Sequence, residues 1–280
     1  MPKLRHLALH TADPEATAAF YKKAFDMVEK GRTNSPLAEG IYLSDGTLNM
    51  AILRYRSPEL AEKYGGSSAL GISHFGFWAE DIEDTRRRLR EAGAEYVDTR
   101  DRATTSTGFF EEKWQGPDGT VLDITDKGWV GALPPGQESS EGQPKIRHVA
   151  LHTADAEGTA DFYKRVFNMS EVGRNPSQFW ESIYLSDGAL NVTLLRFRSP
   201  QLAIKFTGSS VLGLSHFGFL VQSHRQTARR LQEAGAEHMT LAADEQGALI
   251  HSEDKWKGPD GVVFDVTDTG WTGALPLGKE

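Results

Sequence analysis

The sequence predicts an α+β fold of four βαβββ modules, which form two tandem copies of one domain. The first observation behind this prediction is an internal repeat, the feature to seek before secondary structure. KLRHLALHTAD at 3–13 matches KIRHVALHTAD at 145–155 in 9 of 11 positions, an offset of 142 residues. The same offset relates 111–134 to 253–276, with 17 of 24 residues identical and no gap. The second observation is that the period of the apolar residues switches between two and about 3.6, which indicates strands alternating with helices.

The first module of each copy begins with an alternating strand, RHLALHT at 5–11 in the first copy. Asp-Pro at 13–14 then opens a helix over 14–25. A hairpin follows at 41–55, because the Ser-Asp-Gly sequence at its centre suits the positive φ of a tight turn. Ser-Pro at 57–58 starts a short helix, with serine as the cap and proline at the first helical position.

The second module opens with the strand SHFGFWAED at 73–81 and continues with a helix over 82–92. Gly-Pro-Asp-Gly at 116–119 turns the last hairpin before the strand TVLDITD. Between the copies lies a polar stretch rich in Pro, Gly and Ser, which is typical of a linker. We therefore expect one domain at 1–134, a linker at 135–145 and a second domain at 146–280.

The composition excludes several kinds of site and partner, so we expect a small molecule as the partner. The 280 residues include no cysteine, so a disulfide, a thiolate metal site and a cysteine nucleophile are excluded. A formal net charge of −8, without a basic stripe, argues against a nucleic acid or an anionic membrane as the partner. The N-terminal segment MPKLRHLALHTAD lacks the unbroken apolar stretch of a secretory signal, so we expect a cytoplasmic protein.

Several motifs together carry a family resemblance. His-x-Ala-Leu-x-x-x-Asp at 6–13 is followed by Phe-Tyr at 20–21, by Ser-His-Phe-Gly-Phe at 73–77 and by Gly-Pro-Asp-Gly-x-x-x-Asp at 116–123. This pattern resembles the vicinal oxygen chelate superfamily, which includes glyoxalase I, extradiol dioxygenases, methylmalonyl-CoA epimerase, and fosfomycin and bleomycin resistance proteins. The resemblance covers both copies nearly end to end. It implies paired modules that curl into an open cup with one divalent metal, but it does not choose a reaction.

The resemblance also implies which residues bind the metal. The matching positions are a histidine on the first strand of each module and an acid on the last strand of the second, namely His6, His74 and Asp123 in the first copy and His148, His216 and Asp265 in the second. Two imidazoles and one carboxylate form a facial triad that leaves coordination positions open. The family usually has Glu at the third position, so both aspartates depart from its pattern. The family builds cups within and across domains, so two pairings stay open: His6 with His74 and Asp123, or His6 with His216 and Asp265.

The absence of a fourth ligand residue distinguishes between the reactions that members of this superfamily catalyse. Glyoxalase I and the epimerases carry a fourth ligand, Glu or Gln, on the last strand of the first module, but MAILRYR at 50–56 and VTLLRFR at 192–198 contain no such residue. Three protein ligands with open positions favour Fe(II) and dioxygen chemistry, with Mn, Zn and Ni as the other metals that such a site accepts. We therefore expect an extradiol-type dioxygenase that acts on a catecholic or other vicinal-oxygen aromatic. A glyoxalase-type lyase or isomerase and a non-catalytic binder like the resistance proteins are the alternatives.

Residues for proton transfer are harder to locate. Extradiol enzymes usually carry a His before the second ligand and a Tyr before the carboxylate, but 175–215 contains no His, and lysines stand near the Tyr position. His10 and His152 are the candidates, because a spacing of four on a strand places them on the same face as the first ligand. His251 occurs only in the second copy, so it either marks a chemical difference or is a surface loop residue.

Two further sets complete the candidates. Four arginines stand where the fourth ligand is missing, and those that face into the cup would bind an anionic substrate group, whereas those that face outward are ordinary solvated charges. They are Arg54, Arg56, Arg196 and Arg198. The four paired tryptophans are predicted to be core residues rather than substrate stackers. They are Trp114, Trp129, Trp256 and Trp271. Whether the chain forms a homo-oligomer stays open.

Overall fold

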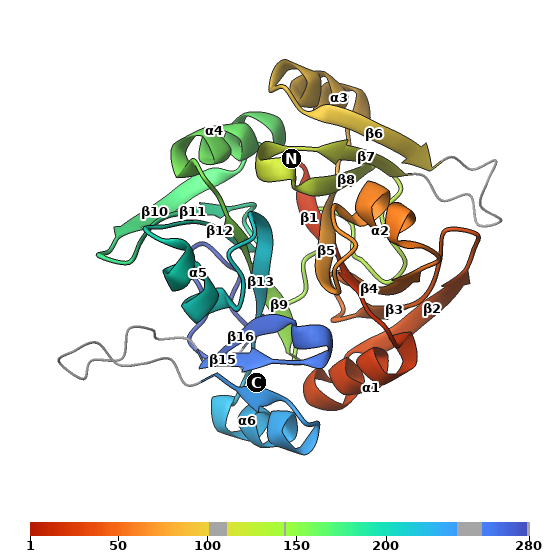
Figure 1. Ribbon diagram of the computed structural model, residues 1–280, viewed down its shortest axis with the longest axis vertical. Coiled ribbons are helices and arrows are strands. Elements are labelled where there is room, and N and C mark those ends of the chain that lie inside the picture. Colours follow the sequence, from red (N-terminus) through yellow and green to blue (C-terminus); the bar gives the residue numbers. More distant parts are fainter. Residues whose placement is uncertain (101–110, 143, 240–253, 279–280) are drawn as a thin grey trace.

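The computed structural model describes residues 1–100, 111–142, 144–239 and 254–278. In this part of the chain each copy forms one open, mixed sheet of eight strands, and neither sheet closes into a barrel (Figure 1). The predicted α+β class with two tandem copies is therefore confirmed. Among the described helices there is no candidate for a membrane span.

The elements follow the predicted order in both copies. The first copy contains β1 (Lys3–His10), α1 (Pro14–Phe25), β2 (Val28–Asn34), β3 (Ala38–Ser44), β4 (Asn49–Tyr55), α2 (Pro58–Gly65), β5 (Gly71–Trp78), α3 (Ile82–Glu91), β6 (Glu95–Arg100), β7 (Glu111–Gln115), the 3-10 turn η2 (Pro117–Gly119) and β8 (Val121–Thr125). The second copy contains β9 (Lys145–His152), α4 (Ala156–Phe167), β10 (Ser170–Pro176), β11 (Trp180–Ser186), β12 (Asn191–Phe197), α5 (Pro200–Thr207), β13 (Gly213–Leu220), α6 (His224–Glu233), β14 (Glu237–His238), β15 (Asp254–Lys257), η3 (Pro259–Gly261) and β16 (Val263–Thr267).

The two modules of a copy join through their first strands. The strand order in the first sheet is β2-β3-β4-β1-β5-β8-β7-β6, and β10-β11-β12-β9-β13-β16-β15-β14 in the second sheet repeats it. β1 pairs with β4 in parallel and with β5 in antiparallel fashion, and β5 pairs with β8 in parallel. The centre of each sheet therefore holds the first strand of both modules and the last strand of each.

Local chemistry explains the ends of the elements. Asp13 caps α1, because its carboxylate accepts hydrogen bonds from the amides of Glu15 and Ala16, and Pro14 takes the first helical position. In the β7–β8 hairpin Asp118 and Gly119 both have positive φ, 56° and 72°, as a primed turn requires. The hairpin after β3 differs from the prediction of a tight primed turn, because there only Gly46 has a positive φ, of 85°.

Asp45 explains this second turn and also joins the two copies. One carboxylate oxygen accepts hydrogen bonds from the amides of Thr47 and Leu48, at 2.8 and 2.7 Å, and the other accepts one from the amide of Ile146, at 2.8 Å. Asp187 makes the reciprocal bond to the amide of Leu4, at 2.9 Å. Each Ser-Asp-Gly turn therefore holds the first strand of the other copy.

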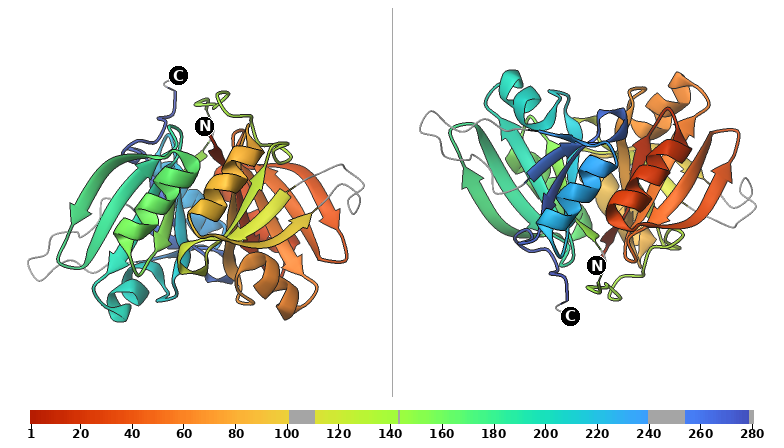
Figure 2. Two further views of the ribbon diagram at one scale, coloured as in Figure 1. Left: turned by 90° about the horizontal axis from the view of Figure 1, so that it is seen from above. Right: turned by 90° about the horizontal axis from the view of Figure 1, so that it is seen from below.

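Four of the helices lie between the two sheets, with α3 beside α4 on one side and α1 beside α6 on the other (Figure 2). α2 instead packs against β4 and β5 on the opposite face of its sheet, where Ala61 joins a cluster with Ala8 and Ala51. Phe25 of α1 stacks on Phe219 of β13 with ring centroids 3.6 Å apart, and Phe167 of α4 stacks on Phe77 of β5 at 3.7 Å. One hydrophobic core, with buried residues from both copies, fills this space. Each copy therefore buries one face of its sheet with the help of the other copy, and the opposite face is left for a site.

We predict that Phe25→Ala lowers the free energy of unfolding by about 3–5 kcal/mol, because the ring is fully buried and the vacated space cannot collapse. Urea unfolding followed by fluorescence and circular dichroism measures this loss. The control Val28→Ala, at a side chain that is 45% exposed, changes the stability by at most about 0.5 kcal/mol. Both copies are expected to unfold in one transition, and two separate transitions would contradict a shared core.

Candidate metal centres

Strand alternation sorts the side chains of β1 onto two faces. Leu4, Leu7 and Leu9 lie in the core between the copies. His6 and His10 lie on the opposite face, which we call the cup face. The register with β5 shifts between Leu4 and His6, and this bulge explains why the two residues, although two apart, face opposite ways. The first predicted ligand is thereby kept out of the apolar core.

Neighbouring strands bring the other two predicted ligands to His6. In the register of β1 and β5, Ala8 lies opposite His74, and in that of β5 and β8, Gly76 lies beside Asp123. Because side chains at successive cup-face positions of adjacent strands point the same way, all three ligand side chains converge. The second copy repeats this register, with Ala150 opposite His216 and Gly218 beside Asp265.

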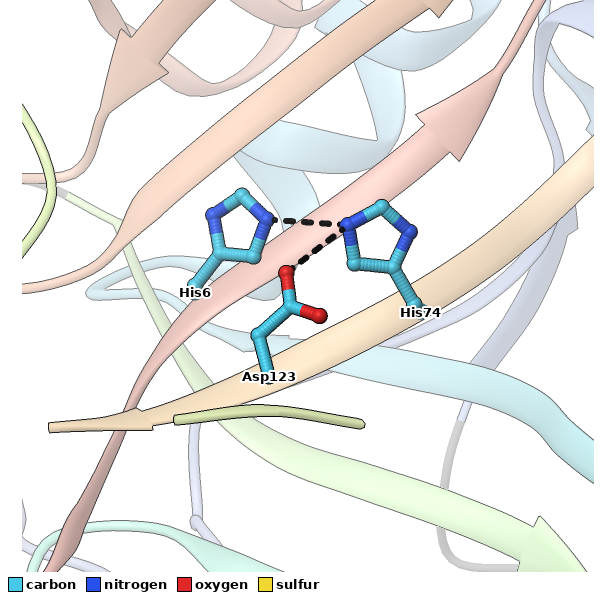
Figure 3. Close-up of side chains that lie close together, drawn as sticks. All are labelled: His6, His74 and Asp123. Carbon is cyan, nitrogen blue, oxygen red and sulfur yellow. Dashed lines mark hydrogen bonds and ion pairs between the residues drawn. The ribbon is translucent and has the colours of Figure 1, made fainter. Parts of the chain in front are cut away.

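The convergence is close in both copies. Nε2 of His6 lies 3.3 Å from Nε2 of His74, which in turn lies 3.3 Å from a carboxylate oxygen of Asp123 (Figure 3). In each copy the three ligand atoms lie within 4.8 Å of one another, and all three residues are buried. The groups form within a copy, because β1 pairs with β5 of its own sheet. Of the two pairings left open, the structure therefore has His6 with His74 and Asp123.

Asn49 sets the tautomer of the first ligand. Its amide nitrogen donates to the carbonyl of Val130 at 2.8 Å, so its oxygen faces His6 and accepts from Nδ1 at 2.7 Å. With the proton on Nδ1, Nε2 presents a lone pair to the centre. Asn191 does the same for His148 in the second copy, with distances of 2.9 Å to Thr272 and 2.8 Å to the ring. Partners of this kind fix the orientation of a metal-binding histidine.

Burial keeps the histidines neutral. The pKa of His6 is lowered to about 4, first by removal from water and then by the neighbouring His74, against the opposing effects of Asp123 and Glu111. The pKa of His216 is lowered by burial and then by Lys255. Since a protonated imidazole cannot bind a cation, both shifts leave these rings ready to act as ligands at neutral pH.

A tryptophan forms the wall behind the first ligand. The rings of Trp129 and His6 are stacked with centroids 4.9 Å apart, and Trp271 and His148 repeat this contact at the same distance. A side chain at Gly76 would come within 2.7 Å of the Trp129 ring, which explains the glycine of Ser-His-Phe-Gly-Phe. The expected core role is confirmed for Trp114 and Trp256. Trp129 and Trp271 instead belong to the candidate sites.

Each carboxylate also has a lysine partner. Nζ of Lys113 lies 2.7 Å from both oxygens of Asp123, and Nζ of Lys255 lies 2.5 Å from one oxygen of Asp265. Burial alone would raise the pKa of Asp265, but the attraction of Lys255 and of His216 outweighs it, so this pKa is lowered. Asp265 is therefore a carboxylate at neutral pH.

Two imidazoles and one carboxylate are the ligand types of a divalent-cation site, and the two copies differ in how far these donors are already paired. In the first copy Nε2 of His6 lies 3.3 Å from Nε2 of His74, so a proton on one of these nitrogens can be donated to the other. In the second copy, the buried Oδ2 of Asp265 lies 3.3 Å from Nε2 of His216, but among the residues that the structure describes it accepts no hydrogen bond of good geometry. An unpaired buried carboxylate oxygen is costly, and a cation beside it removes that cost.

The remaining predicted residues lie elsewhere. His10 and His152 are on the cup face as the spacing predicts, but Nδ1 of each donates to a backbone carbonyl, that of Ala69 at 3.0 Å and that of Val211 at 3.1 Å. His251 falls in 240–253, outside the described residues. Their catalytic role stays a prediction.

The four arginines face outward. Arg54 is half exposed and pairs with Glu39, as Arg56 does at 3.1 Å. Arg196 and Arg198 pair with Glu181 at 3.2 and 3.6 Å. Of the two orientations considered from the sequence, the structure therefore has the one in which these charges are solvated, because alternation along the strand turns them away from the cup.

A cavity opens onto the second group. It has a volume of ≈ 280 Å³, and both histidines and Lys255 line it. Its other lining residues are Asn175, Trp180, Tyr184, Asn191, Thr193, Leu195, Phe197, Phe206, Thr207, Gly270, Trp271 and Thr272. Aromatic side chains and a large set of polar groups thus share the lining, and a concave site of this kind can both pack against and orient a small molecule.

Sequence reasoning gave no role to the asparagines, to the lysines or to the two tryptophans behind the histidines. A signal was available, since all of them are identical between the copies. The spacing to their partners, 43 residues from His6 to Asn49, gave no hint of contact. Only the sheet register brings them together.

We predict that Asn191→Ala weakens divalent-metal binding at the second site by roughly 10- to 100-fold, the usual effect of losing the partner of a metal-binding histidine. The physical reason is that His148 is then free to turn and to protonate the wrong nitrogen. Equilibrium metal titration measures the loss. Asn175→Ala is the control, because Asn175 lines the same cavity without a hydrogen bond to His148, and it should leave the affinity unchanged.

Similar proteins are found among solved structures, whereas no curated protein matches the sequence. Three similar solved structures each cover at least 98% of this chain. They are a mutant of 4-hydroxymandelate synthase from Streptomyces coelicolor (16% identity, 96% of that chain, TM-score 0.72), the 2,3-dioxygenase LapB from Pseudomonas sp. KL28 (15%, 96%, 0.68) and the Mn(II)-bound glyoxalase from Novosphingobium aromaticivorans (16%, 85%, 0.66). At such identities these likenesses show the fold alone. The family model for the Glyoxalase/Bleomycin resistance protein/Dioxygenase superfamily matches residues 3–124 and 145–266, so the chain belongs to this superfamily.

Proposed function

We propose that the chain is a metal-dependent enzyme, an Fe(II) extradiol-type dioxygenase that acts on a catecholic or other vicinal-oxygen aromatic. The observation that carries this proposal is the cavity of the second copy, which reaches both histidines of the metal group and has an aromatic wall. Its volume of ≈ 280 Å³ is close to the lower end of the usual range for ligand sites, about 300–1,000 Å³, and suits a compact substrate.

The absence of a fourth protein ligand supports open coordination positions. On the cup face of β12 the cavity meets Asn191, Thr193 and Leu195. The oxygen of Asn191 is taken by His148, and the hydroxyl of Thr193 donates to that same oxygen, at 2.7 Å. β12 therefore offers no free carboxylate or amide oxygen to the centre, which favours a triad with positions left for substrate and dioxygen.

The residues of this chain have distinct tasks in such a reaction. His148, His216 and Asp265 would hold the metal, and bound Fe(II) would supply chelation of two substrate oxygens and activation of dioxygen. The ring of Trp271 stacks on His148 and so limits the rotation of this ring. Lys255 lines the cavity beside the histidines, so its ammonium group can attract an anionic substrate oxygen. In this proposal the cation for the substrate is a lysine rather than one of the four arginines that were candidates from the sequence.

The central test is oxygen consumption. Anaerobically purified protein reconstituted with Fe(II) is expected to take up dioxygen in the presence of one or more members of a catechol panel, because the triad leaves positions for both reactants. His216→Ala should abolish this uptake, whereas His238→Ala, at a histidine outside the cavity, should retain it. No uptake across the panel by iron-loaded protein would sink the dioxygenase proposal.

A glyoxalase-type lyase or isomerase is the second candidate, supported by the likeness to the Mn(II)-bound glyoxalase. It would use Mn, Zn or Ni to stabilise an enediolate. Turnover of the hemithioacetal of methylglyoxal and glutathione, unaffected by the removal of oxygen, would favour it. The third candidate, a non-catalytic binder, requires protein that retains no metal after anaerobic reconstitution in either copy.

The aromatic wall generates another prediction. Trp180→Ala should raise the KM for an aromatic substrate about tenfold, equivalent to roughly 1.4 kcal/mol, because it removes a large stacking surface. The value of kcat should change less, since Trp180 is not part of the metal group. Steady-state kinetics measure both constants. The control Tyr96→Ala, at an aromatic residue that is 53% exposed, should change neither.

A further inference from the structure

The two metal groups contain the same residues but differ in how the lysine holds the carboxylate. In the first copy Nζ of Lys113 lies 2.7 Å from each oxygen of Asp123. In the second copy Lys255 donates to one oxygen of Asp265 only, and the other oxygen lies 3.3 Å from Nε2 of His216, the contact that Asp123 makes with His74 in the first copy. A carboxylate with one oxygen that is not held by the ammonium group can bind a metal through that oxygen, whereas a carboxylate held by an ammonium group at both oxygens cannot do so without displacing it.

The position of Lys113 is built into the sheet. β7 pairs with β8 so that Lys113 lies directly opposite Asp123, and the lysine side chain is 2% exposed. A second acid, Glu111, lies 3.9 Å from the same ammonium group and accepts a hydrogen bond from the indole of Trp129 at 3.2 Å. The ammonium group is therefore held between two buried acids, and a metal that displaced it from Asp123 would leave it without that partner in a buried place.

The walls of the two cups differ as well. In the first copy, apolar side chains on the cup face pack against one another in a cluster of their own. The buried members are Ala8, Ala38, Ala51, Leu53, Tyr55 and Ala61. In the second copy, the positions that correspond to four of them line the cavity, namely Trp180, Thr193, Leu195 and Phe197. The copy in which the lysine holds only one carboxylate oxygen is thus the copy whose cup face opens onto this cavity.

We propose that Lys113 is the resident cation of the first group: its ammonium group takes the place of a metal on Asp123, so that the chain carries one metal ion, held in the second copy. This inference rests on the proposed function only for the presence of a metal in the second copy. The first group then serves stability, as a buried ion pair that joins β7 to β8.

The test is to remove the lysine charge and count metals. After anaerobic reconstitution with Fe(II) and desalting, the wild-type chain is expected to hold one iron, and Lys113→Met is expected to hold two. Metal-free Lys113→Met should have a lower Tm than wild type, because Asp123 is left as an unpaired buried charge, and Fe(II) should restore that Tm. A lysine with a purely structural role would lower the Tm without rescue by metal.

Matched variants locate the added metal. His74→Ala in the Lys113→Met background should return the count to one, whereas His216→Ala in the wild-type background should reduce it to zero. Lys113→Arg keeps the charge and should stay at one iron. Lys255→Met should also stay at one iron but bind it about tenfold or more tightly, because a neighbouring positive charge has been removed. If Lys113→Met fails to fold, Lys113→Gln is the second neutral variant with the same expected count.

The outcomes separate this inference from the proposed function. Two irons in the wild-type chain, or one iron in both neutral variants, would overturn the role of Lys113, whatever the activity. One iron in the wild type and two in Lys113→Met, without oxygen uptake, would support the role of Lys113 and reject the dioxygenase. A third outcome is a wild-type chain without iron and a Lys113→Met chain with one iron that is lost when His74→Ala is added. This outcome would likewise support Lys113 as the resident cation, but it would reject the proposal that the wild-type chain is a metal-dependent enzyme.

Discussion

The reciprocal stacking of Phe25 on Phe219 and of Phe167 on Phe77 is the contact on which the rest of the structure depends. A sheet of eight strands needs one face covered, and in each copy the cup face has to stay available for the metal group. Helices of the same copy together with elements of the other copy supply that cover, so both copies share one core. The aspartate of each Ser-Asp-Gly turn accepts a hydrogen bond from the first strand of the other copy, so the structure of each copy depends on the other.

This constraint also explains the chemistry of the two centres. Because the middle strands of each sheet are fixed on one face by a packed core, their other face can hold three polar residues in a rigid, buried arrangement. Burial keeps the pKa of His6 near 4 and leaves its lone pair free, while Asn49 holds the proton on the far nitrogen. Charges interact strongly in the same buried surroundings. The lysine opposite each carboxylate therefore affects whether the site can bind a cation.

Much of the site could be predicted, and the parts that could not share a physical cause. The residues His6, His74 and Asp123 were found because a family pattern and a repeat in the same register point to them twice. His10 was placed on the correct face by alternation alone. In contrast, Asn49, Lys113 and Trp129 contact residues on other strands. These contacts depend on the order of strands in the sheet, which neither the spacing nor the periodicity of the sequence reveals. The orientation of Arg54 likewise depends on which face of β4 the core covers.

Taken alone, the sequence determined the duplication, the order of elements in each copy, the absence of thiol chemistry and the six candidate ligand residues that the structure brings together in two groups. These are properties of local patterning and of the repeat, and they need no knowledge of long-range contacts. Only the tertiary structure decided that each metal group forms within one copy, that the arginines face the solvent, and that the two carboxylates differ in their lysine contacts. The reason is that strand pairing and burial arise from contacts between segments far apart in the chain, where a shift of one residue would turn every side chain to the other face.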